Sequence, residues 1–294
     1  MGFARRLRFF WRNSVRQAWI HPWARHDRRG TAARILRWQT LGRLRRGPRA
    51  MRWIGDARLL CAHGLHGLTG NIYYGLAEFP DMAFVMHLLR AGEGFADIGA
   101  NAGSYTVLMG KVAGARVHAV EPDAEALDAL TGNIALNGIG GRVTVHRVAL
   151  AERNGTLAFT QGRGTMNRAA ETGEGSTVTV PARRADEVLA GQGIVACKID
   201  IEGSEEEVLA GAGGLLGEPQ LLAIEIETVS QGSRKRLEDA GFVERWYDPF
   251  ARTLVRADPH LEAPNRLFVR EGGIDLIAQR LRDAPRIRYG RLEI

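Results

Sequence analysis

Apolar residues along the middle of the chain follow two different patterns. Short, nearly continuous apolar runs predict buried strands, and they occur at 94–99, 115–121, 142–150, 194–203 and 221–227. Between these runs, helices are predicted at 104–112, 123–137, 204–210 and 233–240, and the helix at 123–137 has Leu127, Leu130 and Ile134 on one face. Because strands and helices alternate over residues 94–241, we predict an α/β fold with a doubly wound, mostly parallel sheet.

The segments on either side of this core have weaker patterns. Residues 53–80 predict short strands and turns, and a helix follows them. The late segments FVERWY, TLVRA and NRLFVR predict antiparallel strands, and a basic helix is expected at 273–283. The predicted helix caps are Asp81, Ser104 and Asp123, together with a capping box of Ser204 and Glu207.

An inserted hairpin is predicted between the third and fourth core strands. The short runs TLAFT at 156–160 and TVTVP at 177–181 flank a polar, glycine-rich loop. That loop, QGRGTMNR at 161–168, has two interpretations. It is either a movable cover over the active site or a passive hairpin tip.

The composition limits where the protein acts. No run of about 18 apolar residues occurs, so we expect no membrane-spanning helix. The two cysteines, Cys61 and Cys197, are far apart and form no disulfide or metal-binding pattern, which favours a reducing cytoplasm.

Positive charge is concentrated at the N-terminus. Residues 1–50 contain fourteen arginines and a single acid, Asp27, whereas the whole chain has a formal net charge of only +7. Tryptophan and phenylalanine residues lie among these arginines, and Leu7, Phe10 and Trp11 have helical spacing. The extension could pack on the body, lie on an anionic membrane surface or contact nucleic acid, and the sequence leaves these alternatives open.

The clearest chemical signal is the turn after the first core strand, Asp97-Ile98-Gly99-Ala100-Asn101-Ala102-Gly103. It lies at the carboxyl edge of the predicted sheet, where doubly wound folds bind ligands. Gly99 and Gly103 let the backbone approach a ligand closely. The carboxylate of Asp97 would attract an amino group and repel a pyrophosphate, which argues against a nicotinamide dinucleotide.

Glu121 ends the second core strand, 22 residues after Gly99. A carboxylate at that position accepts hydrogen bonds from the two ribose hydroxyls of a nucleoside. Together with Asp97 it predicts a phosphate-free nucleoside that carries an amino acid tail, which is the shape of S-adenosylmethionine.

An ordered set of motifs resembles the FkbM-type methyltransferase family. It consists of LTGNIYYGLAEFPD, DIGANAGSYT, VEP, LTGNIALNG, VALAERNG, KIDIEGSEEEVLAGA and AIEIE, within residues 68–246. The resemblance implies a class I methyltransferase fold with a Rossmann-like sheet, S-adenosylmethionine as donor and a hydroxyl oxygen as the usual acceptor. The family does not normally include the Arg-rich extension, so we divide the chain by composition and pattern into three regions: an extension at 1–50, a methyltransferase domain at 51–272 whose nucleotide-binding core is 92–247, and a basic C-terminal helix and tail at 273–294.

The same resemblance assigns the donor-binding residues. Asp97, Gly99, Asn101 and Gly103 would surround the methionine part and the sulfonium, with the adjoining Ala100 and Ser104 in the same turn. Glu121 would hold the ribose, Pro122 and Asp123 would flank the adenine, and Ala149 would lie against the adenine plane. Asp200 is also expected to position the donor.

Transfer to an alcohol benefits from a general base, and the candidates are acidic. Asp200 and Glu202 are two residues apart, so they would point to the same side of a strand that continues straight. Glu225 and Glu227 repeat that spacing on the next strand. We predict that Asp200, Glu202 and Glu225 are catalytic, and we expect no metal because no histidine or asparagine completes a ligand set.

The predicted function is O-methylation of a saccharide, glycolipid or secondary metabolite. A nucleic-acid methyltransferase and a non-catalytic S-adenosylmethionine-binding protein remain alternatives. The negative net charge of residues 51–294 disfavours nucleic acid as the partner. The expected location is the cytoplasm, with the extension in possible peripheral contact with an anionic membrane.

Overall fold

The computed structural model describes residues 20–44, 47–61, 68–160, 169, 176–257, 265–289 and 292–294. The loop at 161–168 and the aromatic segment around Phe10 and Trp11 therefore lie outside the described residues. No helix in the described ranges is long and apolar enough to cross a membrane.

An eight-stranded sheet forms the centre of the molecule, in the order β12-β11-β13-β10-β9-β3-β4-β5. Five neighbouring strands are parallel: β10 (Ala223–Ile226), β9 (Ile194–Ile199), β3 (Gly94–Ile98), β4 (Arg116–Val120) and β5 (Val143–His146). The late strands β13 (Arg266–Arg270), β11 (Phe242–Asp248) and β12 (Thr253–Arg256) are joined by antiparallel pairing. The prediction of a doubly wound sheet with antiparallel C-terminal strands is confirmed.

The chain changes direction between β3 and β9. From β3 it continues through β4 to β5 on one side, and it later returns through β9 to β10 on the other. The carboxyl ends of β3 and β9 therefore lie side by side without a crossover helix between them. Such a switch point opens a crevice at the edge of the sheet.

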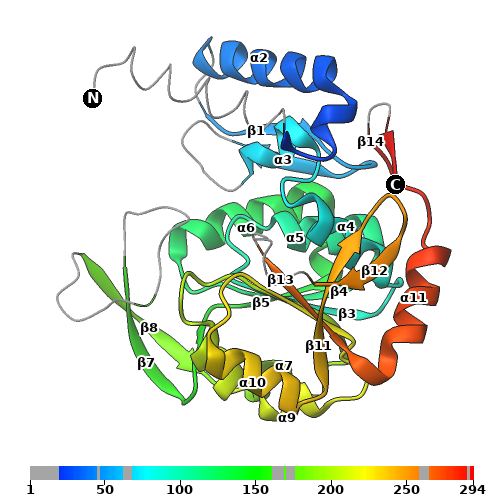
Figure 1. Cartoon of the computed structure of the whole chain (residues 1–294). Helices are drawn as coiled ribbons and strands as arrows, with labels where there is room; N and C mark the ends of the chain where they lie inside the picture. The colour runs from blue at the N-terminus through cyan, green and yellow to red at the C-terminus, as the bar shows by residue number, and fades with distance from the viewer. Residues whose placement is uncertain are drawn as a thin grey trace.

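Helices cover both faces of the sheet (Figure 1). One face carries α4 (Phe79–Leu88), α5 (Ser104–Val107) with the π-helical turn η2 (Leu108–Ala113), and α6 (Ala124–Asn137). The other carries α7 (Ala185–Leu189), α8 (Glu205–Ala210), α9 (Gly213–Gly217) and α10 (Gln231–Asp239). Helix α11 (Ile274–Asp283) packs against α4, and short 3₁₀ turns lie at η3 (Gly140–Arg142) and η5 (Glu271–Gly273).

An additional layer covers the α4–α6 face (Figure 1). It contains η1 (Ala24–His26), α2 (Arg28–Leu44), the hairpin β1 (Arg49–Arg52) and β2 (Arg58–Cys61), and α3 (Thr69–Tyr74), next to the terminal hairpin β14 (Arg288–Tyr289) and β15 (Leu292–Glu293). Trp23 and Trp38 are buried in the same apolar core as α4 and α6. The described part of the N-terminal extension is therefore packed on the body.

Two asparagines of α6 fix the β1–β2 hairpin. Asn133 Oδ1 accepts a hydrogen bond from the backbone N–H of Leu60 at 2.7 Å, and Asn137 Oδ1 accepts one from Arg58 at 2.8 Å. Both asparagines are buried, so each bond satisfies polar groups that water cannot reach.

Several predicted helix starts need correction. Helix α4 begins at Phe79 with Pro80 in its first turn, so Asp81 lies inside the helix instead of capping it. Gly103, not Ser104, is the N-cap of α5. Ser204 precedes α8 but makes no capping bond with its side chain, so the predicted capping box is absent. Asp123 does cap α6, because its Oδ1 accepts from the N–H of Ala126 at 2.8 Å.

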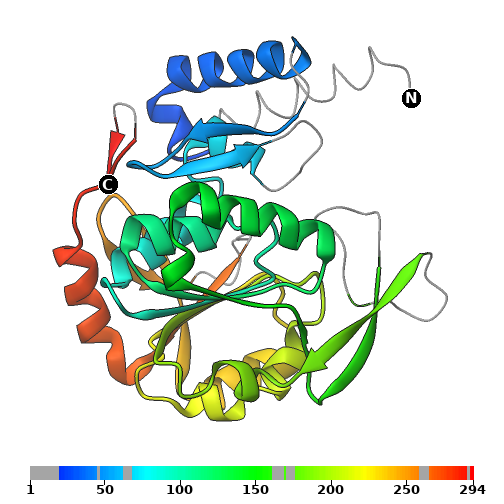
Figure 2. The ribbon, with the colours of Figure 1, turned by 180° about the vertical axis from the view of Figure 1, so that it is seen from behind.

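The predicted hairpin is present as β7 (Gly155–Thr160) and β8 (Thr177–Arg183). Strand β6 (Ala149–Leu150) joins it in a small sheet of its own, so the predicted strand at 142–150 is in fact two strands, β5 and β6. The hairpin extends from the main body (Figure 2). The helix α3 was not expected, because residues 69–74 contain only one turn and a half of helical pattern.

Candidate functional site

The turn after β3 packs directly against the end of β9. Gly99 has a φ of +81°, and a Cβ placed on it would lie 1.9 Å from the carbonyl oxygen of Asp200. The backbone N–H groups of Gly99 and Ala100 donate to the carbonyl oxygen of Val120 at the end of β4. Glycine at this position therefore lets three strand ends meet at one point.

Two non-glycine residues at this point have left-handed backbone conformations. Asn101 has a φ of +49° and Glu202 a φ of +57°, a region that costs free energy for residues with a Cβ. Asn101 offsets part of that cost, because its Oδ1 accepts from the N–H of Ala102 at 2.7 Å. Both residues line the two pockets described next, which is where strained backbone is expected at a functional site.

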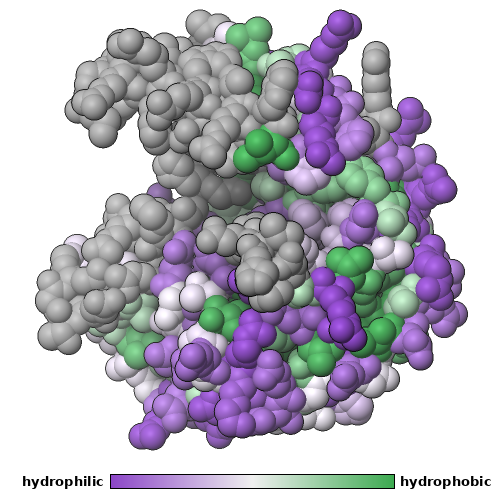
Figure 3. All heavy atoms as spheres, in the orientation of Figure 1, coloured by the Kyte–Doolittle hydropathy of each residue, from purple (hydrophilic) through white to green (hydrophobic). Residues whose placement is uncertain are grey.

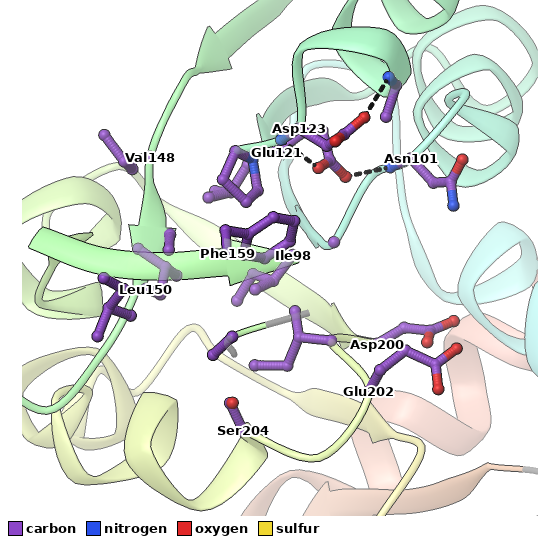
Figure 4. Close-up of a pocket in the computed structure, with 18 residues that line it drawn as sticks. Ile98, Asn101, Glu121, Asp123, Val148, Leu150, Phe159, Asp200, Glu202 and Ser204 are labelled. Atoms are coloured by element: carbon purple, nitrogen blue, oxygen red, sulfur yellow. Dashed lines mark hydrogen bonds between the residues drawn. The ribbon is translucent and has the colours of Figure 1, made fainter. Parts of the chain in front are cut away.

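The first pocket is an open hollow of about 660 Å³, solvent space included, above the carboxyl ends of β3 and β4. Apolar side chains form one side of it, among them Ile98, Leu150 and Phe159 (Figure 4). Glu121 and Asp123 form the opposite, polar side. The apolar side suits an aromatic base, and the carboxyl oxygens of Glu121 and Asp123 suit vicinal hydroxyl groups.

Glu121 is held firmly in place. It is only 6% exposed, and its Oε2 and Oε1 accept hydrogen bonds from the N–H groups of Asn101 and Asp123, each at 2.8 Å. Burial raises the pKa of Glu121 to about 7, and the two N–H donors work against that rise. Each oxygen has a second lone pair, so the carboxyl group can still accept from a ligand.

A second pocket of about 630 Å³ adjoins the first. Both are lined by Gly99, Asn101, Asp200 and Glu202, so they are two parts of one cleft. The carboxyl groups of Asp200 and Glu202 point the same way, away from the apolar wall at Leu150 (Figure 4). The rest of the second pocket is more polar than the first, with Glu78, Asp97, Ser104, Tyr105 and Lys198 among its lining residues.

Lys198 lies at the base of the second pocket and is only 1% exposed. Its Nζ donates to Asn265 Oδ1 at 2.7 Å and lies 3.3 Å from Asp200 Oδ2 and 3.5 Å from Glu78 Oε2. Burial lowers the pKa of Lys198, but the surrounding carboxylates outweigh it and the net pKa is raised. The ammonium group is therefore charged, and it forms ion pairs with both Glu78 and Asp200.

Other acids around Lys198 are more deeply buried. Asp97 accepts from the hydroxyl of Thr106 at 2.5 Å, and burial raises its pKa to about 6. Burial, and then the nearby Glu78, raise the pKa of Asp81 to about 7. Asn265 Nδ2 donates to both Glu78 and Asp81, at 2.8 and 3.2 Å. The cleft is thus built on a polar network in which carboxyl groups outnumber the ammonium.

Three carboxyl groups lie close together, two of them on residues that line the cleft. One oxygen each of Asp200, Glu202 and Glu227 lies within 4.8 Å of the others. Burial and then the neighbouring Asp200 raise the pKa of Glu227 to about 8. Oxygen ligands of this kind are able to hold Mg²⁺ or Ca²⁺. The expectation that the enzyme uses no metal stays a prediction.

The structure brings most of the predicted donor-binding residues together. The lining of the cleft includes Asp97, Gly99, Ala100, Asn101, Ser104, Glu121, Pro122, Asp123, Ala149 and Asp200. Gly103 is not part of that lining. A Cβ on Gly103 would lie 2.6 Å from Leu130 Cδ1, so this glycine is needed for the packing of α6 against α5.

The predicted catalytic residues separate into two groups. Asp200 and Glu202 both line the cleft, although β9 ends at Ile199 and the straight strand assumed for them does not exist. Glu225 is 0% exposed and is not among the residues that line either pocket. Its assignment as a catalytic base was therefore wrong, because an acceptor hydroxyl cannot reach it.

Glu225 is instead a buried acid whose polar neighbours include the hydroxyl of Tyr105 and the ammonium of Lys198. Burial and then the nearby Asp81 raise the pKa of Glu225 well above its ordinary value. Burial therefore favours the protonated form of this carboxyl group in the folded protein.

Sequence reasoning missed Glu78, Tyr105, Lys198 and Phe159. The hydroxyl of Tyr105 donates to Glu78 Oε2 at 3.0 Å, and its ring faces Lys198 Nζ at 5.6 Å from the centroid. Lys198 stood inside the KIDIE motif, but a lone lysine in an apolar strand shows no partner until the neighbouring strands are known. Phe159 is brought to the first pocket by the inserted hairpin.

The sequence model of the methyltransferase FkbM domain matches residues 97–248. The chain belongs to the FkbM methyltransferase family. The match begins at Asp97 and ends with β11, so it includes the glycine turn, Glu121, the Lys198–Asp200 segment and the Glu225–Glu227 segment. The strand order and the antiparallel pairing of β13 are those of a class I methyltransferase.

Solved methyltransferase structures resemble the chain weakly. An rRNA methylase from Streptococcus thermophilus has 14% identity and a TM-score of 0.38, over 64% of this chain and 91% of that one. TYW2 from M. jannaschii in complex with AdoMet has 14% identity and a TM-score of 0.42, over 76% and 85%. An O-methyltransferase from Thermotoga maritima has 13% identity and a TM-score of 0.35, over 64% and 63%. No curated protein matches the chain.

S-adenosylmethionine is the methyl donor of this FkbM protein, and the cleft fits it. Gly99 leaves room against the backbone of Asp200, which a Cβ would fill. The buried carboxyl of Glu121 suits the ribose hydroxyls, and the buried carboxyl of Asp97 suits the amino group of the methionine tail. No phosphate-binding cation lines this turn among the described residues of the first pocket.

We predict that Gly99→Ala weakens the binding of S-adenosylhomocysteine at least about tenfold, because the new Cβ pushes the turn away from Asp200. The control is Gly140→Ala, where a Cβ meets open space and φ is not in the left-handed region. Isothermal titration calorimetry measures both variants. Unchanged affinity in Gly99→Ala would contradict the tight turn.

We also predict that the free energy of unfolding decreases as pH rises above about 5. Burial favours the protonated form of Glu225 in the folded protein, whereas the unfolded chain releases this proton above about pH 4.5, so the stabilising contribution of Glu225 is lost as pH rises, by up to about 1.4 kcal/mol per pH unit. Glu225→Gln keeps the shape but cannot ionise, so urea unfolding should show a shallower slope.

The control for this experiment is Glu238→Gln on the exposed face of α10, which should keep the wild-type slope. The same slope in Glu225→Gln and in the wild type would show that Glu225 is not held protonated.

Proposed function

We propose that the enzyme transfers a methyl group from S-adenosylmethionine to a hydroxyl oxygen of a saccharide, glycolipid or secondary metabolite. The observation that carries this proposal is the position of Asp200 on the wall that both pockets share. The first pocket has the features of a nucleoside site, and the second pocket offers room for an acceptor. Asp200 lies between the two pockets, so its carboxylate could accept the proton of an acceptor hydroxyl.

The bound donor supplies an electrophilic methyl group on a sulfonium, which is a good leaving group. The chain has to orient the acceptor, exclude water and accept the hydroxyl proton. Glu121 and Asp97 orient the two ends of the donor. Tyr105, Ser104 and Glu78 line the second pocket with groups that bond to hydroxyls.

Asp200 is the best-placed base. Its side chain is 37% exposed, so an acceptor can reach it, and its Oδ2 lies 3.3 Å from Lys198 Nζ. That ion pair orients the carboxylate, which also lies against the carboxyl group of Glu227. Glu202 lines the same cleft from a fixed turn and is the second candidate.

The charge of the cleft supports a small, uncharged acceptor over a nucleic acid. Glu78, Asp97, Asp200 and Glu202 line the second pocket with Lys198 as its only described cation. Phosphate groups near these carboxylates would be repelled, whereas proteins that bind nucleic acid present basic surfaces.

We further propose that the protein acts in the cytoplasm, in peripheral contact with an anionic membrane through its N-terminal extension. Helix α2 exposes Arg29 and Arg37 beside Leu36, which is 54% exposed. Figure 3 shows apolar and strongly hydrophilic surface side by side over α2, at the top of the view. Arginines next to an exposed aliphatic side chain suit a surface of anionic lipid.

We expect the full chain to float with vesicles that contain phosphatidylserine and not with vesicles of phosphatidylcholine alone. The double variant Arg29→Glu, Arg37→Glu should lose this binding because it reverses the charge of α2. The matched control, Arg236→Glu with Arg256→Glu, changes the net charge equally on exposed residues elsewhere. Flotation of both double variants to the same extent would reject α2 as the membrane contact.

We expect Asp200→Asn to slow transfer of labelled methyl groups to a glycan acceptor by about 10²–10⁴-fold. The affinity for S-adenosylhomocysteine should stay within about threefold, because the amide keeps the size of the carboxylate. Turnover is measured with labelled donor over a panel of glycans, and affinity by calorimetry. A variant with the wild-type rate would remove Asp200 as the base.

A further inference from the structure

The junction between the two pockets carries more negative charge than its own cation can balance. Asp200 and Glu202 line both pockets, and Glu227 has an oxygen within 4.8 Å of both. Lys198 is the only cation among the described residues that line the cleft. That cation is already shared between Glu78, Asp200 and the side-chain oxygen of Asn265.

Two carboxyl groups near this junction, those of Glu227 and Asp97, have raised pKa values. The pKa of Glu227 is raised to about 8 by burial and then by Asp200 and Glu202, and the pKa of Asp97 is raised to about 6 by burial. Repulsion between neighbouring carboxylates is one of the causes in both cases. A ligand that brings positive charge to the junction would relieve that repulsion.

The donor and its product differ in charge at one atom. S-adenosylmethionine has a positive sulfonium between its nucleoside and its amino acid tail, whereas S-adenosylhomocysteine has a neutral thioether there. The nucleoside end belongs to the first pocket and the tail to Asp97 in the second, so that atom belongs at the junction. The carboxyl groups at the junction therefore lie near the sulfonium of the donor, which loses its positive charge when the methyl group is transferred.

We propose that Glu202 and Glu227, together with Asp200, make the cleft selective for the positive charge of the donor, so that the enzyme binds S-adenosylmethionine more tightly than S-adenosylhomocysteine. This inference rests on the proposed function of the cleft as the donor site. It assigns Glu202 and Glu227 to specificity, and it gives the enzyme a way to release its product, because the product lacks the charge that the carboxylates hold.

The test compares three nucleosides by isothermal titration calorimetry, in buffer with EDTA so that no divalent cation shields the carboxylates. The probes are S-adenosylmethionine, S-adenosylhomocysteine and sinefungin, which has an ammonium-bearing carbon in place of the sulfonium. Both charged probes should bind about tenfold more tightly than S-adenosylhomocysteine, the scale of one charge pair in a partly hydrated site.

Two variants locate the source of the preference. At about pH 9, where Glu227 is ionised, Glu202→Gln and Glu227→Gln should each reduce the preference about threefold or more, and thermal unfolding shows whether each variant is folded. Glu238→Gln on exposed α10 is the control and should keep the full preference. Raising the pH from about 6 to about 9 should increase the preference in the wild type, because Glu227 and Asp97 ionise facing Asp200, Glu202 and Lys198.

The outcomes separate this inference from the proposed function. Equal affinities for the three nucleosides would overturn the charge selectivity and leave the donor site in place. A preference that persists undiminished in both glutamine variants would also overturn it. If none of the three nucleosides binds, the proposed function itself fails.

Discussion

The charge of one buried ammonium group organises the functional end of this FkbM methyltransferase. Lys198 on β9 lies in register with Asp97 on β3 and with Glu225 on β10, so three neighbouring strands carry an acid, a lysine and an acid in a row. The lysine is 1% exposed, and a charge so buried has to be paired. Its ion pairs with Glu78 and Asp200 fix the positions of both acids, and all three residues line the second pocket.

The parts of the site that follow from short sequence segments were predictable. The glycine turn and Glu121 lie at the ends of consecutive strands, and a parallel sheet places both ends at one edge. Residues whose role depends on strand register were not predictable. Glu225 and Glu227 have the same spacing as Asp200 and Glu202, yet Glu225 is buried beside Lys198 and Glu227 lies close to Asp200 and Glu202, because β10 ends between Glu225 and Glu227 at Ile226. Glu78 is the N-cap of a helix for which the sequence pattern predicted Asp81 as the cap, three residues too late.

The distribution of charge separates the two ends of the molecule. The layer around α2 exposes arginines, whereas the cleft is lined by carboxylates with one ammonium among its described residues. An acidic cleft favours a cationic donor and disfavours phosphate-bearing acceptors. The basic extension favours binding to an anionic surface. The acidic cleft is consistent with an acceptor whose reacting hydroxyl end is uncharged. The basic extension is consistent with an acceptor located near a membrane.

The central claim is that the end of β3 and the end of β4 hold a nucleoside without phosphates, with its amino acid tail towards Lys198. A crystal structure of the full chain with S-adenosylhomocysteine tests it most directly. The account predicts the ribose against Glu121, the base beside Phe159 and the tail amino group towards Asp97. Ligand density elsewhere, or a cleft that the protein's own side chains fill when the nucleoside is present, would contradict it.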